Sequence, residues 1–363
     1  MSSIRKDKSS DAFRILMYST KEYDKLSFDT KLQDLKEPDR FEINYSHTRL
    51  TKDTVRMAKS YQAICIFIND ECNHEILKKL NEYGVKLVVL RSCDFNNVDW
   101  KTAEEMDIKI GLVPGYSPNA VAEHAAMLVM ALNRKIHRAY TRVKQGDFRI
   151  DGLVGFDMKD KTVGVLGKLE REMTVERMGI IGQFAISIFR GFGCKVLAYD
   201  DQTTKSEEQE ELDFEYKELE EIYAKADIIS IHLPLNDRTK HIINKSSIDK
   251  MKKGVLLVNT AKGGLIDTQA LIDGLKQEKI GGVGLDVYEN ERKYYFKDYS
   301  SRIIEDDLFA QLLTYHNVII TAHQAFLTQE TLCNIAKVTL ENIHSFTING
   351  KAVYAPKHDE TSK

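Results

Sequence analysis

The chain has 363 residues, of which 42% are hydrophobic, and its formal net charge of −3 results from 52 basic and 55 acidic side chains. This length allows two domains and a large buried core. Because charges of both signs occur along the whole chain, nothing indicates a surface for nucleic acid or for an anionic membrane. Small-molecule chemistry is the favoured function class.

The cysteines and the N-terminal segment suggest a reducing compartment. The chain has five cysteines, without C-x-x-C or Cys/His spacing, so we expect reduced thiols and no metal site. The N-terminal MSSIRKDKSS has no apolar core behind its charges, and no uninterrupted apolar run approaches the length of a membrane span. The sequence therefore predicts a cytoplasmic protein without membrane contact.

The first third of the chain reads as an α/β unit. Short apolar runs at 13–18 (FRILMY), 63–68 (AICIFI) and 85–90 (VKLVVL) predict strands, and 73–83 predicts a helix between two of them. Ser117-Pro118-Asn119 then offers an N-cap followed by proline at the first helical position. We expect a long helix from there to about Gln145-Gly146, bridging two domains.

The second part of the chain alternates strands with helices. This alternation predicts a doubly wound parallel sheet with strands at 162–166, 195–199, 227–232, 254–259, 281–287 and 317–321. A last helical stretch at 328–346 follows the final strand, and we expect it to pack back on the first domain. The predicted boundaries are thus 1–117 with 328–363 for a discontinuous domain, and 118–327 for the second domain.

Residues 161–200 predict a dinucleotide-binding βαβ unit with an interrupted phosphate loop. The motif G-x-G-x-x-G provides a tight turn, close approach of backbone to pyrophosphate, and helix–strand packing. Gly167, Gly179 and Gly182 fit these roles, but eleven residues, 168–178, stand where the motif allows one. Since lengthening a flexible loop costs only about 0.6 kcal/mol per doubling, the surplus is either a harmless excursion or a broken cofactor site. An artefact of gene assembly or splicing is a third interpretation.

Six blocks of sequence in one order resemble the D-isomer-specific 2-hydroxyacid dehydrogenases, and within them the NAD-linked D-lactate dehydrogenases, over roughly residues 13–350. The blocks are Tyr116–His124 (YSPNAVAEH), Gly191–Asp200 (GFGCKVLAYD), His232–Leu235 (HLPL), Asn259–Thr268 (NTAKGGLIDT), Gly284–Glu291 (GLDVYENE) and Thr321–Ala325 (TAHQA). The resemblance implies a Rossmann-type NAD-binding domain with a doubly wound parallel sheet and a discontinuous, flavodoxin-like catalytic domain. It also implies a substrate site at the hinge and a homodimer.

The resemblance further implies reduction of a small, pyruvate-like 2-oxo acid to the D-2-hydroxy acid by hydride transfer. His323 matches the acid–base histidine that protonates the keto oxygen, and Glu291 matches the carboxylate that favours its charged form. At position 262 the family has arginine and this chain has Lys262, which keeps the charge but loses the two-point grip. Losing one charge-assisted bond costs about 1.5–3 kcal/mol.

The expected substrate contacts also depart from the family pattern. Cys93 and Asp94 stand where the family has a small residue and a glycine whose backbone N–H groups receive the substrate carboxylate, and Tyr116 matches a tyrosine near the substrate. If Asp94 faced the substrate, two like charges about 4 Å apart would repel by about 4 kcal/mol at an effective dielectric near 20. Alternatively, its side chain points to solvent. A glycine φ that aspartate tolerates poorly is a further concern.

The cofactor residues follow from the fingerprint and from the resemblance. Asp200 follows the second strand of the βαβ unit, where a carboxylate binds the ribose hydroxyls and repels a 2′-phosphate, so we expect NAD rather than NADP. The complete set expected to bind the cofactor is Gly167, Gly179, Ile180, Ile181, Gly182, Asp200, His232, Pro234, Thr260 and Asp286.

Two alternatives to an active dehydrogenase remain open. The surplus loop, Lys262 and Asp94 affect three separate elements, so the chain is alternatively a degenerate homologue that keeps the fold without turnover. The other alternative is an NAD(H)-sensing binding protein on the same fold. The sequence does not indicate which 2-oxo acid is preferred.

Overall fold

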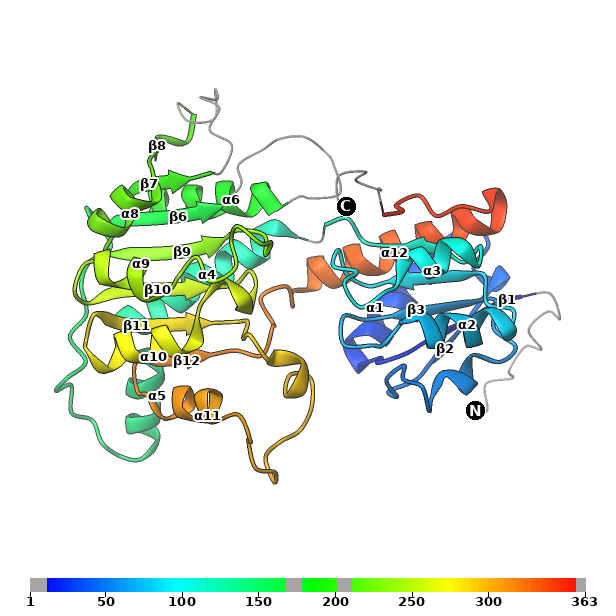
Figure 1. Cartoon of the computed structure of the whole chain (residues 1–363), viewed down its shortest axis with the longest axis horizontal. Helices are drawn as coiled ribbons and strands as arrows, with labels where there is room; N and C mark the ends of the chain where they lie inside the picture. The colour runs from blue at the N-terminus through cyan, green and yellow to red at the C-terminus, as the bar shows by residue number, and fades with distance from the viewer. Residues whose placement is uncertain (1–11, 116, 168–177, 201–210, 357–363) are drawn as a thin grey trace. The chain divides into compact units, whose positions relative to one another are not determined.

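The computed structural model describes residues 12–115, 117–167, 178–200 and 211–356, which form two α/β units (Figure 1). The first unit comprises Met1–Ser117 and Leu327–Lys363, and the second comprises Pro118–Phe326. Both sheets of the described residues are parallel throughout, so the predicted α/β class is confirmed.

The first unit has a five-stranded sheet in the order β2-β1-β3-β4-β5, which is the flavodoxin-like order. Its strands are β1 (Phe13–Met17), β2 (Phe41–Tyr45), β3 (Ala63–Ile66), β4 (Leu87–Leu90) and β5 (Lys109–Gly111). β3 and β4 are buried at every position, as expected for a parallel sheet covered on both faces.

Helices from both ends of the chain cover the sheet of the first unit. They are α1 (Glu22–Gln33), α2 (His74–Glu82), α3 (Trp100–Glu105) and α12 (Gln329–Asn349). The C-terminal helix α12 packs on α1 and the sheet, and its Leu340 and Ile343 share one core with Ile15 and Met17 of β1 (Figure 1). α12 thus joins the C-terminal part of the chain to the core of the first unit.

The second unit has a seven-stranded sheet in the order β12-β11-β10-β9-β6-β7-β8. Its strands are β6 (Thr162–Gly167), β7 (Lys195–Tyr199), β8 (Glu215–Tyr216), β9 (Ile228–His232), β10 (Val255–Asn259), β11 (Ile280–Leu285) and β12 (Val318–Ile320). The strand order reverses between β6 and β9, which is the topological switch point of a Rossmann fold. Ligands of such sheets bind at the carboxyl ends of the strands there.

Two apolar cores flank this second sheet. The helices of the second unit are α4 (Pro118–Asn133), α5 (Ile136–Lys144), α6 (Met178–Gly191), α8 (Leu219–Lys225), α9 (Lys245–Lys250), α10 (Thr268–Lys276) and α11 (Asp307–Thr314). One core joins the sheet to Leu128 of α4 and Phe189 of α6. The other joins it to α8–α11, with Leu271 and Phe309 among its buried residues.

The prediction of one long helix from 118 to about 146 is wrong. α4 ends at Asn133 and α5 begins at Ile136, because Lys135 between them adopts a left-handed backbone with φ 50°. The buried side chain of Asn133 makes two hydrogen bonds to the backbone of Phe156, which fixes the end of α4. Tertiary contacts therefore end the helix where its local pattern would continue.

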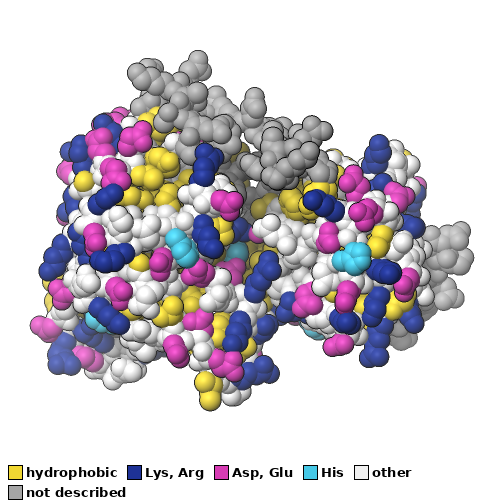
Figure 2. Space-filling model, in the orientation of Figure 1, with side chains coloured by type: hydrophobic (Ala, Val, Ile, Leu, Met, Phe, Trp, Pro, Cys, Tyr) yellow, Lys and Arg dark blue, Asp and Glu magenta, His cyan; other side chains and the backbone are white. Residues whose placement is uncertain are grey.

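The surface shows mixed charge, and the helices show no membrane span. On the face in Figure 2, basic and acidic side chains are interspersed over both units. Within the described ranges, none of the helices combines the length and the apolar character that crossing a bilayer requires.

Candidate active site

The phosphate loop begins at the carboxyl end of β6, and α6 starts beside it. A Cβ atom on Gly167 would lie 3.8 Å from Cα of Gly182 and 3.3 Å from Cβ of His232. The first turns of α6, which contain Gly179, Ile180 and Ile181, thus begin next to the end of the strand. The surplus segment itself, 168–177, lies outside the described residues. The long connection leaves β6 and α6 together, as the excursion interpretation requires.

Two buried polar atoms at the carboxyl ends of β9 and β10 have no hydrogen-bond partner among the described residues: Nδ1 of His232 and Oγ1 of Thr260. Nε2 of His232 lies 2.8 Å from Oγ of Ser230, and burial lowers the pKa of the imidazole to about 4, so the ring is neutral near pH 7. Orphaned buried polar atoms are rare in native proteins. Both belong to residues expected to bind the cofactor, which supplies polar groups of the kind that they lack.

The remaining residues expected to bind the cofactor lie at the same edge of the sheet. Asp200 directly follows β7 and is only 4% exposed. Pro234 follows β9, and its carbonyl accepts a hydrogen bond from Oγ1 of Thr239. These residues lie beyond the carboxyl ends of β6, β7, β9 and β10, around the switch point. This arrangement fits a dinucleotide.

Lys262 lies in a tight loop after β10. Oδ1 of Asn259 accepts from the N–H of Ala261 at 3.0 Å, and its Nδ2 donates to the carbonyl of Lys262 at 2.9 Å. A Cβ on Gly263 would lie 2.1 Å from the backbone carbonyl carbon of Tyr288. Only glycine fits there, so the loop that carries Lys262 packs directly on the loop after β11.

His323 and Glu291 form a hydrogen-bonded pair. Nδ1 of His323 lies 2.8 Å from Oε1 of Glu291, and the side chains are 16% and 19% exposed. The other carboxylate oxygen of Glu291 accepts from the N–H of Tyr288 at 3.0 Å, which fixes its orientation. Since Glu291 occupies Nδ1, Nε2 is the ring nitrogen that can act on a substrate. The ring of Phe296 lies with its centroid 6.3 Å from that of the imidazole.

A fully buried carboxylate, Asp286, holds the loop that carries His323. Its Oδ1 accepts from Oγ1 of Thr321 at 2.6 Å and from the N–H of Gln324 at 2.9 Å, and its Oδ2 accepts from the N–H of Ala325 at 2.9 Å. Its backbone carbonyl accepts from the N–H of His323 at 2.8 Å. His323 has φ 53°, a left-handed conformation that costs of order 1–3 kcal/mol and persists only where the surrounding structure enforces it. Asp286 supplies that enforcement.

His124, which was not among the predicted site residues, completes this network. Its Nε2 lies 3.1 Å from Oγ1 of Thr321 and 3.5 Å from Oδ1 of Asp286. Burial lowers the pKa of His124, and the charge of Asp286 opposes this only in part, so the ring is neutral near pH 7. Because the hydroxyl proton of Thr321 goes to Asp286, we assign the Nε2–H tautomer to His124. Its place as the last residue of the Tyr116–His124 block was the available signal.

In the first unit, Cys93 and Asp94 lie in the loop after β4. Oδ1 of Asp94 accepts from the N–H of Asn96 at 3.0 Å, so the carboxylate turns back on its own loop. Asp94 is not among the described residues with positive φ, so the concern about a glycine-like backbone does not apply. Arg91 anchors the start of this loop, because its buried guanidinium donates to the carbonyls of Tyr18 and Ser19 at 3.1 and 3.3 Å. Tyr116 lies outside the described residues.

Comparison with known proteins decides the family. Residues 126–325 match the model of the D-isomer-specific 2-hydroxyacid dehydrogenase NAD-binding domain. The chain is 46% identical over 331 residues to a 2-hydroxyacid dehydrogenase homolog of Haemophilus influenzae, covering 91% of this chain and 95% of that protein. It belongs to the D-isomer-specific 2-hydroxyacid dehydrogenase family. The resemblance inferred from the sequence, the oxidoreductase class and NAD as cofactor are thereby confirmed.

Further relatives and solved structures support the same family assignment. The D-lactate dehydrogenase of Escherichia coli is 43% identical over 330 residues, covering 91% of this chain and 95% of that protein. Its apo structure has a TM-score of 0.81 at 40% identity, and the alignment covers 93% of this chain and 98% of that one. The NAD⁺-bound D-lactate dehydrogenase of Lactobacillus jensenii has a TM-score of 0.76 at 28% identity, covering 95% and 100%.

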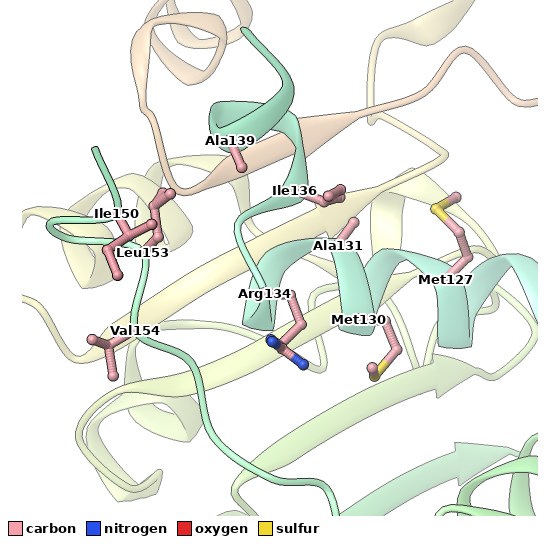
Figure 3. Close-up of a pocket in the computed structure, with 9 residues that line it drawn as sticks. All are labelled: Met127, Met130, Ala131, Arg134, Ile136, Ala139, Ile150, Leu153 and Val154. Atoms are coloured by element: carbon pink, nitrogen blue, oxygen red, sulfur yellow. The ribbon is translucent and has the colours of Figure 1, made fainter. Parts of the chain in front are cut away.

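Apart from the NAD-binding edge, this dehydrogenase carries an exposed apolar face on α4, α5 and residues 150–154. These segments line a depression of about 740 Å³. Figure 3 shows the side chains that line it. Ile136, Ile150 and Val154 are 57%, 80% and 82% exposed. Exposed apolar side chains grouped in this way indicate an interaction surface. Among the described residues, no cluster of His, Cys, Asp or Glu is suited to holding a metal.

Proposed function

We propose that this chain reduces pyruvate, or a close 2-oxo acid, to the D-2-hydroxy acid with NADH, as its relatives named D-lactate dehydrogenase imply. The observation that carries the proposal is the hydrogen bond between Nδ1 of His323 and Glu291, which orients an acid–base group beside the carboxyl edge of the NAD-binding sheet. Bound NADH supplies the hydride. The protein's own residues bind the substrate, orient it and provide the proton.

His323 is the proposed acid–base group. Nε2–H of His323 donates its proton to the keto oxygen, while Glu291 holds the ring in place through Nδ1. Asp286 keeps the histidine in position through the 321–325 loop. Acid–base assistance of this kind contributes typically 10²–10⁴-fold to a rate, so its loss should abolish measurable turnover.

Lys262 is the proposed cation for the substrate carboxylate and keto oxygen. Its loop is fixed by Asn259 and by the packing of Gly263 on Tyr288, which supports a defined position for the backbone that carries this side chain. An ammonium group acts as a point charge, so the substrate is held less rigidly than by the planar fork of an arginine. Cys93, Asp94 and Tyr116 remain proposed substrate contacts on the basis of the resemblance.

The proposed cofactor set is Gly167, Gly179, Ile180, Ile181, Gly182, Asp200, His232, Pro234, Thr260 and Asp286. The unpartnered Nδ1 of His232 and Oγ1 of Thr260 support this set, because both are buried and need hydrogen-bond partners. Asp200 would bind the ribose hydroxyls, which favours NAD over NADP. The carboxylate of Asp286 would act on the cofactor site indirectly, by holding the loop that carries His323.

The test uses the full chain and a His323→Ala variant. NADH binding is measured by calorimetry, and NADH oxidation is followed with pyruvate. We expect turnover by the parent chain, loss of turnover in the variant, and nearly equal NADH affinity of both, because the acid acts in the transition state rather than on the cofactor. A variant that keeps most of its kcat would exclude His323 from the mechanism.

A degenerate or NAD(H)-sensing protein is the second candidate. Lys262 and Asp94 favour it, since both replace residues that the family uses for the substrate carboxylate. NADH binding by the parent chain without reduction of any small 2-oxo acid would support this candidate and exclude the first.

We also propose that a second copy of the chain covers the apolar face of α4, α5 and residues 150–154. The exposure of Ile136, Ile150 and Val154 supports this. Light scattering should give a dimer for the parent chain and a monomer for an Ile150→Asp, Val154→Asp double variant. A monomeric parent, or a variant that stays dimeric, would contradict the proposal. The cytoplasmic location expected from the sequence stays a prediction.

A further inference from the structure

We propose that His241, Glu289 and Thr268 form a brace that positions the catalytic loops after β10 and β11. This inference rests on the proposed function, in which those loops carry Lys262 and Glu291. The brace makes no proposed contact with substrate or cofactor. Its members are positioning residues that act through Glu291.

The brace joins three segments through one carboxylate. Oε1 of Glu289 lies 2.6 Å from Nε2 of His241, which follows β9. Oε2 of the same carboxylate accepts from Oγ1 of Thr268, the first residue of α10, at 3.1 Å. Both oxygens are therefore engaged, each by a different segment, and Glu289 itself lies in the loop after β11.

Backbone hydrogen bonds hold the His241 segment to the Lys262 loop. The N–H of His241 donates to the carbonyl of Gly264 at 2.9 Å, and the N–H of Ile243 donates to the carbonyl of Leu265 at 3.1 Å. His241 has φ 52°, and its own carbonyl accepts from Nδ2 of Asn244 at 2.9 Å. The imidazole thus projects from a fixed backbone, so its bond to Glu289 fixes the position of that carboxylate.

Glu289 connects this framework to the acid–base pair. A Cβ on Gly263 would lie 2.4 Å from the backbone nitrogen of Glu289, so the Lys262 loop rests on the peptide before Glu289. The neighbouring Tyr288 N–H donates to the carboxylate of Glu291, and Glu291 binds Nδ1 of His323. A shift at Glu289 therefore moves the donor that orients Glu291.

The exposure of the His241–Glu289 pair indicates that it contributes little to the overall stability of the fold. The side chains of His241 and Glu289 are 34% and 30% exposed, and ion pairs this accessible to water contribute little to overall stability. Their value lies in local geometry, where a misplacement of about 1 Å can lower a rate by about 10²-fold. Variants of either residue should therefore fold.

The test compares three variants of the brace with the parent chain. Glu289→Ala removes both bonds, whereas Glu289→Gln keeps an acceptor for His241 and a donor for Thr268. His241→Asn keeps a residue type that tolerates positive φ but lacks the reach to Glu289. Glu22→Gln is the matched control, because it removes the carboxylate of the exposed His47–Glu22 ion pair in the first unit.

We expect kcat for pyruvate to fall about tenfold in Glu289→Ala and in His241→Asn, which corresponds to about 1.4 kcal/mol. Glu289→Gln should restore most of kcat, and Glu22→Gln should match the parent. The KM for pyruvate should change less than kcat, and NADH affinity should stay the same. The Glu289→Ala, His241→Asn double variant should be no worse than Glu289→Ala alone, since the His241–Glu289 bond is already lost in that single variant.

Three results would overturn the brace: unchanged kcat in Glu289→Ala, equal losses in Glu289→Gln and Glu289→Ala, or additive losses in the double variant. If the parent chain binds NADH but does not turn over, the proposed function fails while the brace stays testable by amide hydrogen exchange. Faster exchange at 262–266 and 288–292 in Glu289→Ala, but not in Glu289→Gln or Glu22→Gln, supports it. Unchanged exchange refutes it.

Discussion

Replacing Asp286 with asparagine tests whether this buried carboxylate holds the His323 loop. The carboxylate accepts three hydrogen bonds, from the hydroxyl of Thr321 and the N–H groups of Gln324 and Ala325. Asparagine has nearly the same shape but only one acceptor oxygen. If that oxygen keeps the bonds to Thr321 and Gln324, the amide NH₂ faces the N–H of Ala325, so two donors oppose each other.

The expected cost follows from this count. Hydrogen bonds to a charged group are worth about 1.5–3 kcal/mol each, and a buried unsatisfied donor costs about 1–3 kcal/mol. Losing one bond in the closed loop should therefore shift the loop away from its catalytic conformation by about 1.5–3 kcal/mol. If only that conformation turns over, kcat falls roughly 10- to 150-fold.

The assay is kcat for pyruvate with saturating NADH, together with the unfolding temperature. Asp227→Asn is the matched control, since Oδ2 of Asp227 also accepts a backbone N–H, that of Thr162, in the same unit. The control should lose stability but keep kcat. A kcat of Asp286→Asn within about twofold of the parent, with both variants folded, would refute the idea that the Asp286 carboxylate holds the His323 loop.

Three further predictions concern substrate, acid stability and the phosphate loop. Lys262→Arg should raise kcat/KM for 2-oxo acids by about tenfold, because one charge-assisted bond is regained; steady-state kinetics with no gain would contradict the assignment. The pKa of His232 is about 4 in the folded protein and near 6.5 in the unfolded chain. The contribution of His232 to the free energy of unfolding should therefore be complete above pH 6.5 and fall by about 3 kcal/mol towards pH 4. Urea unfolding of His232→Gln should lack that part of the slope, and an identical slope would refute it. Deleting 168–177, which joins Gly167 to Met178, should strengthen NADH binding in calorimetry, whereas equal affinities would make the segment a harmless excursion.

The sequence predicted the strands that form apolar runs and missed three others. β9 and β10 are uninterrupted apolar runs that are buried at every position, and such runs are readable from sequence alone. β2, β5 and β8 were not predicted. β2 is an edge strand with mostly half-buried residues, and β8 has only two residues. Such strands form because a neighbour in the sheet is already present, and a local pattern does not encode that neighbour.

The candidate site was predictable in its residues more than in its connections. Family blocks brought His323 and Glu291 together although 32 positions separate them. The hold of Asp286 on the His323 loop and the contact of His124 with that loop depend on hydrogen bonds across 35 or more positions, from Asp286 to Thr321 and from His124 to Thr321. Spacing along the chain carries no information about such contacts. They appear only when β11, α4 and the loop after β12 are assembled.

The most direct test of the central claim is the configuration of the product that the full chain forms from pyruvate and NADH, determined by chiral chromatography. We expect D-lactate in amounts equal to the NADH consumed. L-lactate as the product, or NADH that binds without any lactate being formed, would contradict it.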